Sequence, residues 1–172
     1  SAVAAYAVAD KLKQQALTVY RPVSQVLQGW TPSGGKQLIK RRVRTARRLI
    51  VVAAAMGGVA FATLLPVGAA VLAESIEMPL VYAAPFAIAF AMNIASLSIG
   101  VGCLLPLQRE HHVTVSAALG MALVSLSIIP GALWWGGTGA AWAVAFSQTA
   151  VASYQTIVLA RALRPTKESA HV

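Results

Sequence analysis

The sequence predicts an all-α membrane protein, a bundle of helices that cross a bilayer several times. The chain of 172 residues is 58% hydrophobic and only 11% charged, whereas soluble domains carry about 25% charged residues. Its mean hydropathy is +0.69. Uncharged segments extend over 49–73, 78–108 and 113–160. A single soluble core of this size cannot bury so many apolar residues, so a bilayer is the expected solvent.

The first segment, 1–30, has the pattern of a long amphipathic helix. Its polar residues recur every three or four positions and share one helical face: Lys11, Gln14, Thr18, Arg21, Gln25 and Gln28. An apolar face opposes them: Val8, Leu12, Ala16, Val19, Val23 and Val26. A helix of about 30 residues reaches about 45 Å, enough to cross a bilayer. From the pattern alone, the helix either lies in the membrane interface or crosses it with the polar stripe toward water.

A basic segment, 31–48, follows and is expected to be a cytoplasmic loop. Pro32, Gly34 and Gly35 end the first helix. Lys40, Arg44 and Arg47/Arg48 would share a helical face beside the next span, which favours anionic lipid head groups as partners. Plain orientation signalling is the alternative interpretation. Nucleic acid is not an expected partner.

Four further spans are expected at 49–73, 80–105, 113–134 and 139–160. A spanning helix needs about 20 apolar residues. The last uncharged segment is long enough for two helices, and residues that break helices lie near its middle: Pro130, Gly131, Gly136, Gly137 and Gly139.

The distribution of basic residues predicts the orientation. With these spans, one side of the membrane carries Lys36, Lys40, Arg41, Arg42, Arg44, Arg47, Arg48, Arg109, Arg161, Arg164 and Lys167. The opposite loops, 74–79 and 135–138, hold Glu74 and Glu77 and no basic residue. The basic side, with the tail 161–172 and the C-terminus, is therefore expected in the cytoplasm. The chain starts at Ser1 without a cleavable signal, and we expect a fragment of a longer protein.

Small and polar residues inside the spans predict helix contacts. Ser96 with Gly100, Ser98 with Gly102, and Gly57-Gly58 let helix backbones approach closely. Cys103 is expected to be a small packed side chain. Three polar residues, Asn93, Gln148 and Gln155, serve either interhelical hydrogen bonds or a cavity wall.

No pattern of a catalytic or metal site is present. His111 and His112 are adjacent, so on a helix they point about 100° apart and do not share a metal as residues four apart do. They are expected in a short hydrated loop at 106–112. No nucleophile with a nearby base and no phosphate-binding glycine loop occurs. We expect no enzyme and no cofactor.

Three stretches of the sequence, YAVADKL at 6–12, VYRPVSQVL at 19–27 and GGTGAAWA at 136–143, are similar to segments of one transporter family. That family is the polysaccharide-export and oligosaccharide flippases of the multidrug/oligosaccharidyl-lipid/polysaccharide superfamily. PLQR at 106–109 falls at that family's short basic loop but lacks its glycine. The resemblance covers nearly the whole chain. It implies that 1–172 is the C-terminal lobe, five spanning helices of a six-helix lobe like those of MATE transporters, with 1–30 as a true span.

The resemblance also implies a function, alternating-access export of lipid-linked oligosaccharides or polysaccharide precursors across a bacterial plasma membrane. The partners would be the lipid-linked glycan, anionic membrane lipids and the N-terminal lobe of the same protein. A cation-coupled multidrug exporter and a non-transporting scaffold of a polysaccharide-synthesis complex are the alternatives. The candidate cavity-lining residues are Lys11, Gln14, Thr18, Arg21, Gln25, Lys13, Asp10, Asn93, Gln148 and Gln155.

The cations of the first helix are the sharpest expectation. Lys11 and Arg21 lie on the polar face and should reach one enclosed volume, with Lys13 at its edge. Lys and Arg both suit the oxygens of a pyrophosphate. Asp10 is expected to interact with neighbours near Gln14 or with a cation on another helix.

Overall fold

Four α-helices make up most of the structure, a computed structural model that describes residues 2–31, 36–72 and 80–164. They are α1 (Ala2–Trp30), α2 (Lys36–Leu72), α3 (Ala83–Ile99) and α4 (Glu110–Ala162). A short 3-10 helix, η1 (Leu80–Tyr82), precedes α3, and a π-helix, η2 (Gly100–Leu104), follows it. The described residues form no strand, so the all-α prediction is confirmed for them.

The predicted helix over 1–30 is confirmed by α1, and the expected basic segment 31–48 is helical from Lys36 onward, which agrees with the expected helical face of Lys40, Arg44 and Arg47/Arg48. Helix α2 begins at Lys36 and runs without interruption into the apolar segment. Its first turns consist largely of Lys, Arg, Leu and Gln, which favour helix, and the first glycine is Gly57. The basic residues therefore extend the helix beyond the apolar segment.

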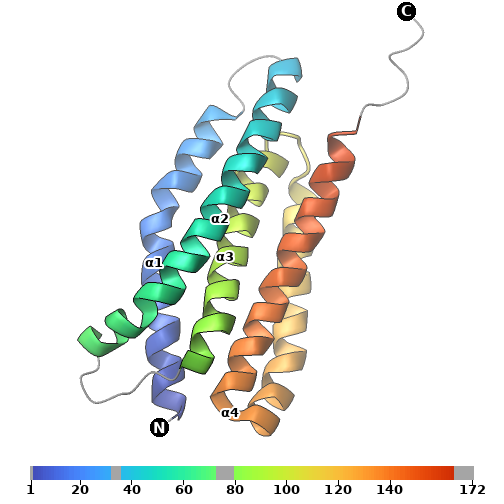
Figure 1. Cartoon of the computed structure of the whole chain (residues 1–172). Coiled ribbons are helices and arrows are strands. Elements are labelled where there is room, and N and C mark those ends of the chain that lie inside the picture. Colours follow the sequence, from blue (N-terminus) through green and yellow to red (C-terminus); the bar gives the residue numbers. More distant parts are fainter. Residues whose placement is uncertain (1, 32–35, 73–79, 165–172) are drawn as a thin grey trace, which may run out of the picture.

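Helix α4 doubles back on itself. Gly136 has φ 59° and ψ −143°, outside the helical region, and the chain reverses there into a second, antiparallel arm (Figure 1). Glycine adopts a positive φ without the steric cost that a side chain would bring. Ser147 Oγ donates to the carbonyl oxygen of Gly120 at 2.8 Å, which joins the two arms. The predicted break between 134 and 139 is thus confirmed, although both arms extend beyond 113–134 and 139–160.

The helices form an elongated bundle with α3 inside it (Figure 1). Helix α3 contacts α1, α2 and α4. The most apolar window of Ala83–Leu104 is 56% buried inside the protein, against 28% for Leu38–Val71 and 11% for Glu110–Ala162. These three segments are long and apolar enough to cross a membrane. The structure is therefore compatible with a membrane protein whose outer helices expose apolar surface.

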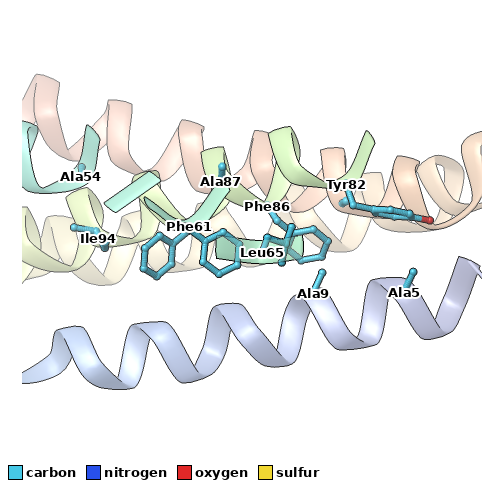
Figure 2. Close-up of a cluster of buried hydrophobic side chains, with 11 residues drawn as sticks. Ala5, Ala9, Ala54, Phe61, Leu65, Tyr82, Phe86, Ala87 and Ile94 are labelled. Atoms are coloured by element: carbon cyan, nitrogen blue, oxygen red, sulfur yellow. The ribbon is translucent and has the colours of Figure 1, made fainter. Parts of the chain in front are cut away.

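Two buried clusters hold the bundle together. One joins α1, α2 and α3 through Ala9, Phe61, Leu65 and Phe86 (Figure 2). The other includes Val43, Ile50, Cys103 and Leu159 near the opposite end. Gly58 lies against α3, where a Cβ would come within 3.0 Å of the Ala91 Cβ. The prediction of close contacts at small residues is confirmed there, and Cys103 is fully buried as expected.

The described basic residues, apart from those on α1, gather at one end of the bundle. The start of α2, the start of α4 and the end of its second arm lie together there (Figure 1). Arg42 donates to the carbonyl oxygen of Trp30 at 2.8 Å and lies over its ring. Two expected segments lie outside the described residues: the acidic loop with Glu74 and Glu77, and the part of the tail that starts at residue 165.

Candidate functional site

Helix α1 lies lengthwise along α3 and presents three faces. Near its start, the ring of Tyr6 contacts that of Phe86 at 5.3 Å. Farther along, the Tyr20 hydroxyl and Ser98 Oγ are hydrogen-bonded at 2.7 Å, and Leu27 lies against Gly102 of η2. The residues between Tyr6 and Leu27 are therefore level with the apolar segment Ala83–Leu104.

The inward face of α1 carries several small side chains and some polar ones. Ala5, Ala9, Lys13 and Ser24 are buried on it. The outer polar face, which we call the stripe, carries five exposed residues: Lys11, Gln14, Thr18, Arg21 and Gln25. A third face is apolar and also exposed, with Val19 at 80%, Val23 at 47% and Val26 at 70%. The prediction of two faces is corrected to three, because α3 packs against the sector between the polar stripe and these valines.

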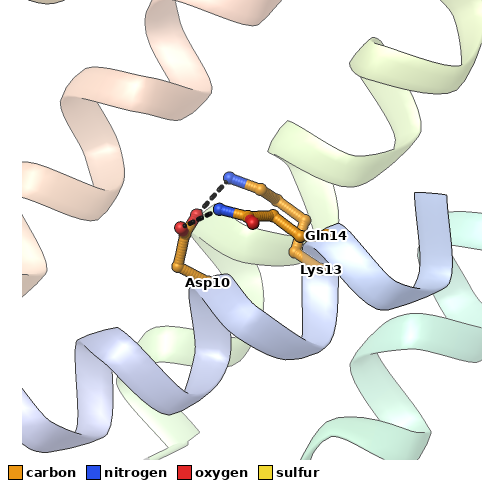
Figure 3. A network of polar contacts seen from close by, with 3 residues as sticks. All are labelled: Asp10, Lys13 and Gln14. Atoms are coloured by element: carbon orange, nitrogen blue, oxygen red, sulfur yellow. Dashed lines mark hydrogen bonds and ion pairs between the residues drawn. The ribbon is translucent and has the colours of Figure 1, made fainter. Parts of the chain in front are cut away.

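Asp10, Lys13 and Gln14 form a local network on α1 (Figure 3). Lys13 Nζ lies 2.6 Å from Asp10 Oδ1, and Gln14 Nε2 donates to Asp10 Oδ2 at 2.7 Å. Lys13 also lies 5.5 Å from the centre of the Phe86 ring. The expected contact of Asp10 near Gln14 is present, and the neutralising cation belongs to the same helix.

The structure revises the expected arrangement of the three cations. Lys13, expected at the edge of the polar face, is buried against α3 and paired with Asp10. Lys11 and Arg21 are exposed, and neither has an ion-pair partner in the part of the chain that the structure describes. Two uncompensated positive charges therefore remain on the outer stripe, and they face away from the described bundle.

The other polar candidates lie elsewhere. Gln155 is buried on the second arm of α4, and its Nε2 donates to Ser116 Oγ on the first arm at 2.8 Å. Asn93 and Gln148 are half-buried. Among the described residues, no hydrogen bond joins any of these three to the stripe of α1. Gln155 thus serves helix contact, one of its two expected roles.

Polar contacts also gather near η2, which sequence reasoning did not predict. Tyr20 reaches Ser98 just before it, and a Cβ at Gly100 would lie 3.6 Å from Gln155 Nε2. His112 lies in the first turn of α4, which begins at Glu110, rather than in the loop expected at 106–112. Its Nδ1 is 2.9 Å from the Tyr154 hydroxyl. A π-helix in an α-helical protein often marks a functional position. The pair of glycines at 100 and 102 was the only signal in the sequence.

Two of the cavities in the described part of the chain are apolar and lie close to α1 or to the turn of α4, but both are separate from the stripe. One, of about 780 Å³, lies at the turn of α4 and is lined by Trp134, Trp135 and Trp142 among others. The second, of about 480 Å³, lies between α1 and α2 beside Val19 and Tyr20. Neither includes Lys11 or Arg21. The described residues also contain no group of three His, Cys, Asp or Glu that could hold a metal.

Together, the fold and the stripe define a class: an all-helical protein with three candidate membrane helices and a cationic face beside them. Comparison of the chain with protein-family models, curated proteins and solved structures gave no match.

Proposed function

We propose that the chain is one lobe of a membrane transporter that moves an anionic, lipid-linked glycan across a bacterial plasma membrane by alternating access. One observation carries this proposal: Lys11 and Arg21 are exposed and unpaired within the described residues, level with the apolar helix α3. A charged side chain at the centre of a bilayer costs about 2.5–3.5 kcal/mol on insertion scales. Water or another part of the protein must therefore cover the stripe.

In the proposed arrangement, five segments cross the membrane: α1, the apolar part of α2, α3 and the two arms of α4. Helix α1 has 29 residues, a length of about 44 Å at 1.5 Å per residue, which exceeds the hydrocarbon thickness. A second lobe would face the polar stripe and enclose a hydrated cavity. The basic end of the bundle and the C-terminus would lie in the cytoplasm.

The chemistry of the stripe favours an anionic substrate. Arg21 offers a planar fork of donors and Lys11 a compact charge, and both bind phosphate oxygens. Gln14, Thr18 and Gln25 lie on the same exposed face and can hydrogen-bond sugar hydroxyls. The resemblance of 6–12, 19–27 and 136–143 to polysaccharide-export flippases supports a pyrophosphate-linked glycan.

The pairing of Asp10 with Lys13 argues against the first alternative function, a cation-coupled drug exporter. A cation-coupled drug exporter would use an unpaired carboxylate in a span, whereas Asp10 already binds Lys13 and Gln14. A scaffold protein would instead use the stripe to contact a partner, and its cations would then be needed for assembly but not for export.

Complementation of a flippase-deficient strain with the full-length protein tests the proposal. We expect the Lys11→Gln/Arg21→Gln variant to lower glycan export at least about tenfold, since each lost charge-assisted hydrogen bond is worth about 1.5–3 kcal/mol. Its level in the membrane should be unchanged, because neither side chain packs in the bundle. Lys13→Ala should affect export less.

The matched control is Arg41→Gln/Arg109→Gln, which removes two exposed charges at the basic end. It should export normally. Normal export by Lys11→Gln/Arg21→Gln would eliminate the cationic-cavity hypothesis. Loss of export together with loss of a co-purifying synthesis partner would favour the scaffold.

A further inference from the structure

A cleft lined by four arginines lies at the basic end of the bundle, away from the stripe on α1. Arg44, Arg47 and Arg48 project from α2, and Arg164 follows the second arm of α4. The cleft has a volume of about 360 Å³, and Ala160 and Leu163 complete its lining. None of the four arginines forms an ion pair within the described residues. Four arginine residues thus line one small cleft, and no carboxylate among the described residues neutralises them.

An apolar groove continues along the same two helices. It has a volume of about 520 Å³, and its lining includes Val51 and Ala55 of α2 and Ala152 and Ile157 of α4. Helix α3 also contributes to the lining, through Ala91, Met92, Ala95 and Ile99. Positions 44, 47, 48, 51, 54 and 55 are spaced by three and four, so they share one face of α2. Positions 160, 157 and 153 share one face of α4 in the same way, and Arg164 follows just beyond the end of this helix. The cleft and the groove therefore follow one another along α2 and α4.

The exposed side chains change character where the cleft meets the groove. Arg44, Arg47 and Arg48 are exposed above the junction. Below it, Val51 is 62% exposed and Ile157 51% exposed. Polar, charged surface followed along a helix by exposed apolar surface is the pattern of a membrane–water boundary. The arginine cleft thus lies where phospholipid head groups would lie.

We propose that this surface is a binding site for one anionic phospholipid, with the phosphate in the arginine cleft and an acyl chain in the groove between α2 and α4. Arginine binds phosphate oxygens through paired, charge-assisted hydrogen bonds. The small side chains of Ala54, Ala55 and Ala152 leave room for a hydrocarbon chain. Free phosphate would use the cleft alone, whereas a phospholipid uses both parts. The site does not depend on the transport proposal, since it shares no residue with the stripe.

Native mass spectrometry of the full-length protein in detergent, with phosphatidylglycerol or phosphatidylcholine added, tests the head-group part. We expect the protein to retain one phosphatidylglycerol in preference to phosphatidylcholine. The Arg47→Gln/Arg48→Gln variant should lose affinity for phosphatidylglycerol by about fivefold for each charge removed. Arg41→Gln/Arg109→Gln, with the same loss of charge outside the cleft, should retain the lipid. An equal loss in both variants would overturn a localised site and leave only diffuse attraction.

A second pair of variants tests the acyl groove without changing charge. Ala55→Leu fills the groove and should lower phosphatidylglycerol retention, while Ala70→Leu, at another exposed alanine of α2, should not. Unchanged retention in Ala55→Leu would overturn the acyl part of the proposal. Displacement of the lipid by millimolar inorganic phosphate would overturn it in favour of an anion site. Absence of retained lipid from the wild type would overturn it in favour of cover by another segment of the protein.

Discussion

Helices α1 and α4 both lie on the outside of the bundle and expose apolar side chains, but only α1 also exposes a long polar face with two cations. In α4, only 11% of the most apolar window is buried, and Leu126, Ile129 and Leu133 are each more than 60% exposed. In α1, one outer face carries Lys11, Thr18 and Arg21. The bundle therefore has two kinds of exterior, one suited to lipid and one suited to water or to another polar protein surface.

The two exteriors follow from how each helix meets the core. Helix α4 directs polar groups inward, between its two arms: Ser147 donates to the Gly120 carbonyl oxygen, and Gln155 Nε2 donates to Ser116 Oγ. Among the described residues, the buried Gln155 Oε1 has no hydrogen-bond partner. The outer face of α4 is left free to be apolar.

Helix α1 pairs its inward polar groups, Asp10 with Lys13 and Tyr20 with Ser98. On the outer stripe, Gln14 and Thr18 form hydrogen bonds within the helix. Lys11 and Arg21 have no ion-pair partner among the described residues. The positive charges of the outer stripe therefore require water or another part of the protein around them.

The largest expected effect comes from placing the same new charge on each exterior. Leu126→Lys puts a charge on the apolar face of α4 and should destabilise membrane insertion by about 3 kcal/mol. Thr18→Lys adds a charge to a stripe that is already polar and should change insertion by less than about 0.5 kcal/mol. Membrane-fraction levels and glycosylation mapping of engineered acceptor sites measure both. Equal losses in the two variants would show that α1 and α4 meet the same environment.

A smaller effect is expected within α1 itself, between its two lysines. Lys13→Ala leaves the Asp10 carboxylate without its cation in a partly buried position, and should lower the free energy of unfolding by about 2 kcal/mol. Lys11→Ala removes an exposed side chain and should change it by less than about 0.5 kcal/mol. Denaturant unfolding in micelles, followed by circular dichroism, gives both values. Rescue of Lys13→Ala by Asp10→Asn would identify the unpaired carboxylate as the cause.

Much of the fold could be predicted because strong local signals specify it. Length and hydropathy indicated α2, α3 and α4, the three- and four-residue spacing indicated α1, and the glycines around 136 indicated the reversal in α4. The basic turns were expected to share a helical face, but their continuity with the apolar part of α2 was not predicted, because charge marks a membrane boundary and does not end a helix. The π-helix η2 was also missed, since it depends on how Gly100 and Gly102 pack against Leu27 and Gln155.

The candidate site was less predictable, for a geometric reason. A helical projection of α1 separates polar from apolar residues, but α3 determines which sector turns inward. It approaches along Ala5 and Ala9, and this places Lys13 inside and the valines at 19, 23 and 26 outside. The number of five membrane crossings and the cavity itself stay predictions, because they depend on the bilayer and on chain segments that face the stripe.

The last prediction concerns two adjacent residues and involves almost no change in stability. Thr18 and Val19 are both exposed on α1, but they lie on the polar and the apolar face respectively. In the full-length protein in its membrane, Thr18→Cys should react with a charged, water-soluble maleimide at least about tenfold faster than Val19→Cys, because only a hydrated thiol ionises to the reactive thiolate. The native Cys103 is fully buried and should contribute little background, which the wild type measures. Equal rapid labelling would place all of α1 in water, as for a helix at the membrane surface. Rapid labelling confined to Thr18→Cys would show that water reaches the stripe alone, the condition that a cationic transport pathway requires.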